Sequence, residues 1–155
     1  MHIAASVHLR PCSMPRMLIA VSSLISGLVA LYLHLWKIGK AGSLACGGDG
    51  GCAYVQGSQY GWFLGVDVAL IGTIGYTLIF LVSMIGTTER FEDSKAITRT
   101  LQVLIWGAVL FTIRLKWAEF VILKSFCPWC AVSAVTIVIC AILVTLDARR
   151  LARAE

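Results

Sequence analysis

The sequence predicts an all-α integral membrane protein, a four-helix bundle, on three observations. Of its 155 residues, 59% are hydrophobic and only 14% are charged. A soluble domain has roughly 45–50% apolar and about 25% charged residues, so this chain has too few polar side chains for a surface in water. Its apolar residues fall into four runs long enough to cross a bilayer. These runs lack the residue-by-residue alternation of a transmembrane β-barrel.

We expect the four spans at about residues 17–36, 66–86, 100–123 and 127–146, within one transmembrane domain over residues 17–146. The first is an unbroken apolar run of 20 residues. As a helix it would be about 30 Å long, the thickness of a bilayer core. Its length exceeds that of a signal-peptide core, and no small-x-small cleavage site follows Trp36. We therefore expect this span to stay in the protein.

The third span carries charged residues near its end. Arg114, Lys116 and Glu119 lie among aromatic and aliphatic residues. We expect the two cations to extend toward the lipid headgroups. Lys116 and Glu119 are three positions apart, which allows an ion pair on one helix face. An ionisable residue inside a span is costly, so Glu119 is a candidate functional residue.

The basic residues predict the topology. Four spans place an N-terminal arm (1–16), the loop after the second span and a basic tail (147–155) on one side. That side has eight Lys and Arg residues, and the other has five: Lys37, Lys40, Arg114, Lys116 and Lys124. The excess marks the first side as cytoplasmic, and we expect a multi-pass protein of the cell inner (cytoplasmic) membrane with residues 37–65 facing outward. The net charge of +5 lies at span edges rather than in one patch, which argues against binding nucleic acid.

Four of the six cysteines lie at the predicted outer face: Cys46, Cys52, Cys127 and Cys130. The other two have simple interpretations. Cys12 lies in the N-terminal arm, and Cys140 is deep in the fourth span, where a thiol acts as a small apolar side chain.

The motif Cys127-Pro128-Trp129-Cys130 opens the fourth span. Pro128 suits the first position of a helix, which places Cys127 at the N-cap. Free backbone N–H groups and the positive helix end would favour its thiolate. A structural bond would close too short a loop to add much stability. A redox dithiol therefore fits best, while a membrane metal-binding module built from the four outward cysteines stays open as the alternative. Stoichiometric metal, lost on oxidation, would favour that module.

Cys46 and Cys52 flank the segment 47–51, which contains four glycines. Such a segment changes shape at little steric cost. Two interpretations remain open, a flexible loop closed by a static disulfide and a mobile disulfide that exchanges electrons with an outside protein.

Together, CGGDGGC, Ser58, the YGWFLG stretch (60–65) and CPWC resemble the vitamin K epoxide reductase family, most closely its bacterial members. The order of the motifs, a loop pair after the first span and a CxxC at the start of the fourth, is the most specific part of the resemblance. The resemblance implies a membrane thiol:quinone oxidoreductase that supports disulfide-bond formation. It further implies that Cys46 is attacked by a thioredoxin-like partner, that Cys52 exchanges with Cys127, and that Cys130 faces the quinone.

The resemblance also implies the other participants. The cofactor would be a membrane quinone, either ubiquinone or menaquinone. Ser58, Trp129 and Glu119 are our candidates for binding it, and Ser58 is equally well explained as a turn residue. Because few residues follow the fourth span, we expect the thioredoxin-like partner to be a separate protein outside the cytoplasm.

Overall fold

The computed structural model describes residues 14–46 and 51–153. Four long helices form the molecule: α1 (Met14–Lys37), α3 (Val68–Gly86), α4 (Lys95–Trp117) and α5 (Pro128–Arg153). Each is long and apolar enough to cross a membrane, with α4 continued by a π-helical turn, η3 (Ala118–Leu123). Most of the predicted N-terminal arm and residues 47–50 of the glycine segment lie outside the described residues.

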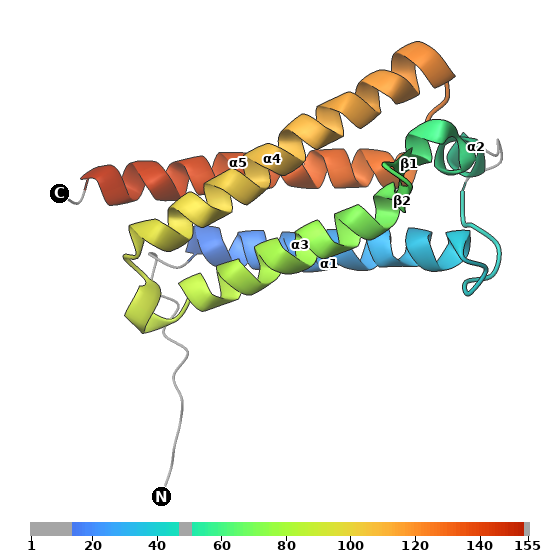
Figure 1. The fold of residues 1–155 in the computed structure, drawn as a ribbon. Helices are drawn as coiled ribbons and strands as arrows, with labels where there is room; N and C mark the ends of the chain where they lie inside the picture. The colour runs from blue at the N-terminus through green and yellow to red at the C-terminus, as the bar shows by residue number, and fades with distance from the viewer. Residues whose placement is uncertain (1–13, 47–50, 154–155) are drawn as a thin grey trace, which may run out of the picture.

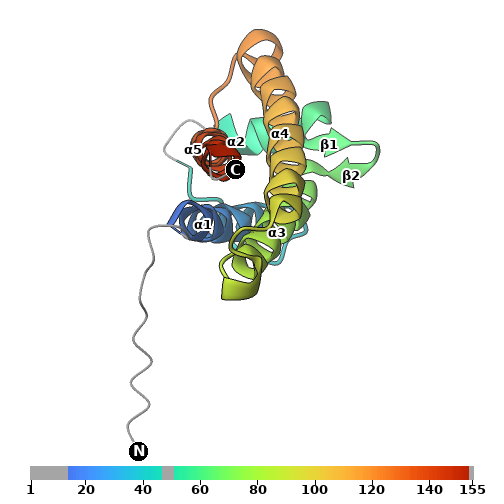
Figure 2. The ribbon, with the colours of Figure 1, turned by 90° about the vertical axis from the view of Figure 1, so that its left-hand side faces the viewer.

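Consecutive long helices run in opposite directions along the bundle (Figures 1 and 2). α1 packs against α3 and α5, and α4 packs against α5 and α3. Residues 38–46, 51–67 and 118–127 therefore meet at one end of the bundle, which we call the cysteine end, and residues 87–94 lie at the opposite end. The all-α, four-helix prediction is confirmed.

Short elements cover the cysteine end. The helix α2 (Gly51–Gly57) is followed by the 3-10 turn η1 (Gln59–Gly61). The strands β1 (Trp62–Phe63) and β2 (Val66–Asp67) then pair antiparallel. Their hairpin turns through Leu64 and Gly65, both at positive φ. The remaining 3-10 turn among the described residues, η2 (Glu89–Phe91), lies at the opposite end.

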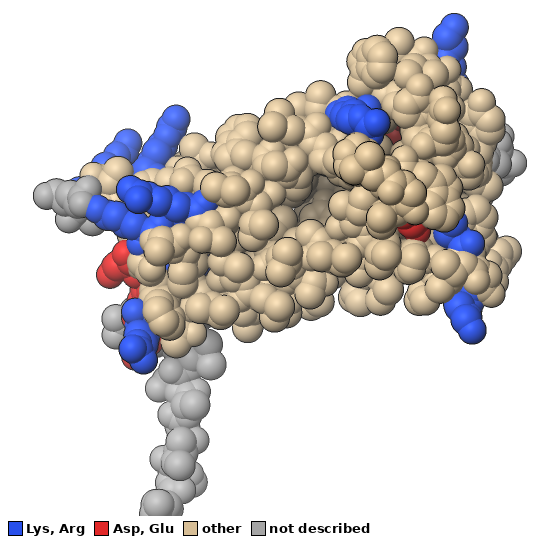
Figure 3. Space-filling model, in the orientation of Figure 1, with Lys and Arg blue, Asp and Glu red and all other residues tan. Residues whose placement is uncertain are grey.

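Apolar side chains fill the interior and also cover the outside. The buried core includes residues from all four long helices: Ile19, Tyr76, Ile79, Leu101, Ile105, Ile137, Cys140, Ala141 and Val144. On the outer face, Val103 is 74% and Leu110 69% exposed. Lys and Arg gather toward the two ends, and a belt of uncharged residues lies between them (Figure 3). Such a belt matches a lipid environment.

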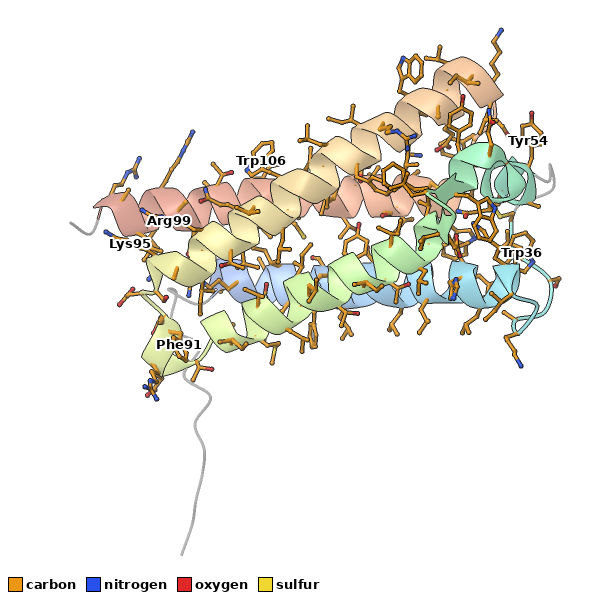
Figure 4. The ribbon with its side chains drawn as sticks, viewed as in Figure 1. Trp36, Tyr54, Phe91, Lys95, Arg99 and Trp106 are labelled. Carbon is orange, nitrogen blue, oxygen red and sulfur yellow. A yellow bond between two sulfur atoms is a disulfide. The ribbon has the colours of Figure 1, made fainter. Side chains whose placement is uncertain are left out.

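Labelled side chains show the same arrangement (Figure 4). Trp36 and Tyr54 lie at the cysteine end, whereas Lys95 and Arg99 lie at the opposite end. Trp106 points outward from the middle of α4. Aromatic side chains at the cysteine end are placed as expected for a membrane interface.

A buried ion pair joins α1 and α5 at the opposite end, where α1, α4 and α5 extend past the expected spans. Arg16 lies inside α1 and is 1% exposed, and Asp147 lies inside α5 and is fully buried. Arg16 Nε donates to Asp147 Oδ2 at 2.9 Å, and Thr98 Oγ1 donates to the same oxygen at 2.8 Å. The arginine also donates to the carbonyl oxygens of Gly86 and Phe91. Asp147 therefore lies within α5, which continues to Arg153.

Candidate active site

The CxxC motif begins the helix α5. Pro128 is its first residue and Cys127 precedes it, which confirms the predicted N-cap arrangement. The backbone N–H of Cys130 donates to Cys127 Sγ at 3.3 Å. Hydrogen bonds from the Cys130 thiol and then from this N–H hold the pKa of Cys127 below its ordinary value, although burial opposes them. Both thiols are free in the structure.

The second cysteine pair is a disulfide between Cys46 and Cys52. Its two sulfurs differ in access. Cys46 is half-buried at the end of the loop after α1, whereas Cys52 in α2 is 1% exposed. An outside thiolate would therefore reach Cys46 first. The expected glycine hinge between the two cysteines lies outside the described residues, apart from Gly51.

The helix α2 lies directly against the residues that precede Cys127. A Cβ added at Gly51 would lie 2.7 Å from the Phe126 carbonyl oxygen and 3.1 Å from Ser125 Oγ. Only a glycine allows this approach without a shift. Gly51 precedes Cys52, and Phe126 precedes Cys127, so the backbone contact brings the two cysteine pairs together.

The buried face of α2 carries two chemically active side chains. Cys52 and Gln56 are the buried residues of this helix, and they are four positions apart, on one face. Gln56 Nε2 donates to Cys130 Sγ at 3.4 Å. The same face of α2 thus contains the buried Cys52 and presents an amide to Cys130.

Glu119 fixes the backbone in front of the CxxC. The residue is 2% exposed. Its Oε1 accepts the N–H of Cys127 at 2.7 Å, and its Oε2 accepts from Lys116 Nζ at 2.7 Å. The Lys116–Glu119 ion pair was predicted from spacing and is confirmed. The bond to Cys127 was not predicted, because it depends on the π-helical turn and on Lys124, whose φ of 46° reverses the chain.

A small pocket with a volume of about 50 Å³ opens beside Cys130. It lies between α2, α4 and the residues that lead into α3, and mixes apolar walls with a few polar groups. Its lining includes Gln56, Tyr60, Thr112, Lys116, Glu119 and Cys130. Lys116 donates to Glu119 and has further ammonium protons for a ligand oxygen.

Two of the expected quinone-binding residues lie away from this lining. Ser58 Oγ donates to the Val55 carbonyl oxygen at 2.7 Å within a local turn. Trp129 Nε1 donates to the Ala45 carbonyl oxygen at 2.8 Å, and its ring packs edge-on against Tyr32 at 6.1 Å. Trp129 thereby holds the residue next to Cys46. A quinone-binding role for Ser58 and Trp129 stays a prediction.

Sequence reasoning missed Gln56 and a buried cluster around Asp67. Asp67 is 4% exposed and caps α3, since its Oδ1 accepts the N–H of Ala69 at 3.0 Å. Lys37 Nζ and His34 Nδ1 also contact this carboxylate, at 2.5 and 2.7 Å. Burial raises the pKa of Asp67, but these hydrogen bonds outweigh it and leave the pKa below its ordinary value. The three-residue spacing of His34 and Lys37 in the sequence was the one signal that could have pointed to this cluster.

Within residues 14–46 and 51–153, no three His, Cys, Asp or Glu side chains are grouped to hold a metal ion.

Four membrane-length helices with two adjacent cysteine pairs at one end define the class as a multi-pass membrane protein with a dithiol–disulfide centre. Residues 17–145 match the model of the vitamin K epoxide reductase family. The chain belongs to this family, and its membership implies a membrane thiol oxidoreductase.

Proposed function

We propose that this protein passes electrons from a thioredoxin-like protein outside the cytoplasm to a membrane quinone, and so supports disulfide-bond formation. One observation carries the proposal. The helix α2, which contains the buried Cys52, contacts the CxxC region through Gly51 and Gln56, and Cys130 lines a pocket between membrane helices.

In the proposed relay, the partner dithiol reduces the Cys46–Cys52 disulfide by attack at Cys46, the more accessible sulfur. The Cys52 thiolate then attacks Cys127 of an oxidised CxxC, which releases Cys130 as a thiolate, and Cys46 resolves the bridge. The CxxC is thereby reduced, and the outer pair becomes a disulfide again. The structure has these redox states, with an outer disulfide and two free inner thiols.

The final step joins the two inner sulfurs. The dithiol of Cys127 and Cys130 becomes a disulfide, and its two electrons and two protons convert a quinone to a hydroquinone. Of the candidate residues, Cys130 and Glu119 line the pocket, and Lys116 lines it beside them. The quinone, ubiquinone or menaquinone, would supply the electron-accepting ring when bound. Lys116 offers N–H donors to its oxygen, and Glu119 holds the backbone of Cys127 in place.

The basic residues support an orientation with the cysteine end outside the inner membrane and the opposite end in the cytoplasm. This places the half-buried Cys46 where an extracytoplasmic partner can dock.

The variant Cys130→Ala tests the relay. The purified protein is mixed with a reduced thioredoxin-like partner and a short-chain ubiquinone. Without Cys130, attack by Cys127 on Cys52 leaves a trapped Cys52–Cys127 bridge, and quinone reduction is lost. The matched variant Cys140→Ala, which alters a core thiol away from the site, keeps turnover and forms no such bridge. Quinone turnover by Cys130→Ala at the normal rate would show that the relay is wrong.

A further inference from the structure

Gln56 is the polar residue of this site whose bonding is incomplete. The side chain is 5% exposed, and it lines the pocket beside Cys130. Its Nε2 donates to Cys130 Sγ, but its Oε1 is buried and accepts no hydrogen bond in the described structure. A buried carbonyl oxygen without a donor is unfavourable, and such groups in folded proteins call for an explanation.

The backbone holds Gln56 firmly in this position. Gly61 lies so close to the main-chain carbonyl oxygen of Gln56 that a Cβ at position 61 would collide with it. The helix α2 is in turn held against the CxxC by the contact between Gly51 and Phe126. The main chain thus keeps the amide at the pocket, where a molecule that enters can supply the missing donor.

The other polar groups of the pocket indicate what kind of molecule can supply that donor. Lys116 is a donor and Glu119 already accepts from Lys116 and from Cys127. Both faces of a quinone ring are apolar, and its two oxygens only accept. A hydroquinone has the same ring, but each oxygen carries a hydrogen that it can donate.

We propose that Gln56 is a specificity-determining residue for the reduced ligand: its Nε2–H donates to the Cys130 sulfur while its Oε1 accepts an O–H of the hydroquinone. The inference rests on the proposed function and adds to it. One side chain contacts both the sulfur and the hydroquinone that the reaction produces. The pocket then binds the hydroquinone more tightly than an aprotic ring of the same shape.

The test uses the full-length protein in detergent, decylubiquinone as substrate and decylubiquinol as product inhibitor. The variant Gln56→Met keeps the length of the side chain but removes both polar amide atoms. We expect its inhibition constant for decylubiquinol to rise by about tenfold, which corresponds to the loss of one buried hydrogen bond. The KM for decylubiquinone rises less. The control is Gln59→Met, the same substitution three residues on at an exposed position of η1, and it leaves both constants unchanged.

A second measurement needs no variant. The dithiol-reduced wild-type protein is alkylated at Cys130 in the presence of decylubiquinol or of its dimethyl ether, which has no O–H. The hydroquinone protects Cys130 at about tenfold lower concentration than the ether. Equal protection by the two compounds, or unchanged decylubiquinol inhibition in a folded Gln56→Met protein, would overturn the role of Gln56. A wild-type protein that reduces no quinone would instead overturn the proposed function.

Discussion

At the scale of single residues, the chemistry of Cys127 is set by its neighbours. Two hydrogen bonds to its sulfur, both involving Cys130, favour the thiolate. The charges of Glu119 and Lys116 act in opposite directions on the same sulfur, because the carboxylate raises the pKa of Cys127 and the ammonium lowers it. Since the two groups form an ion pair, each limits the effect of the other.

This balance of charges predicts that two variants shift the pKa of Cys127 in opposite directions. Glu119→Gln keeps an oxygen for the Cys127 N–H but removes the negative charge, so the pKa of Cys127 falls. Lys116→Met removes the positive charge, so that pKa rises. The pH at which the alkylation rate of Cys127 reaches half its maximum moves down in the first variant and up in the second. Mass spectrometry of the labelled peptide measures it. Shifts in the same direction would contradict this account.

At the scale of elements, a contact between α2 and the segment before α5 holds the helix that contains Cys52 against the start of the CxxC. The approach depends on Gly51, which lies against the backbone of Phe126. Another glycine of the same helix, Gly57, has open space around it. The two positions therefore separate the effect of a close contact from the effect of the substitution itself.

We expect Gly51→Ala to slow electron transfer from the outer to the inner pair by about tenfold or more, because the added methyl pushes α2 away from Phe126 and small displacements of reacting groups are costly. Gly57→Ala should transfer electrons at the wild-type rate. Rapid mixing of the partner-reduced protein with quinone follows the step by the absorbance of the quinone. Equal rates in the two variants would show that the contact does not position Cys52.

At the scale of the whole molecule, one buried ion pair ties the helices together far from the cysteines. Arg16 of α1 and Asp147 of α5 also engage Thr98 of α4 and the carbonyl oxygen of Gly86 at the end of α3. All four long helices therefore meet at this network. Removing one partner leaves a buried charge without compensation, which is far more costly than losing a surface pair.

We predict that Arg16→Met and Asp147→Leu each lower the free energy of unfolding by about 3–5 kcal/mol. The double variant loses less free energy of unfolding than the two single variants together, because neither buried charge remains without its partner. Unfolding by a denaturing detergent, followed by circular dichroism, measures the loss. The control Asp93→Asn alters a surface pair with Arg150 at 3.5 Å and changes stability by less than about 1 kcal/mol. Strict additivity in the double variant would refute the coupling.

The sequence by itself determined the class of fold, because apolar runs long enough to cross a bilayer must satisfy their own backbone hydrogen bonds and become helices. It also determined where the fourth helix begins, since Pro128 suits a first helical position, and it predicted the Lys116–Glu119 pair from spacing along one helix. These features depend on residues near one another in the chain.

Only the tertiary structure decided which distant residues meet. Gln56 reaches Cys130, Asp67 accepts from His34 and Lys37, and Arg16 pairs with Asp147, across separations of 30 residues or more. Local patterns do not encode such contacts. They arise because a polar group buried by helix packing must find its partner in whichever helix lies beside it.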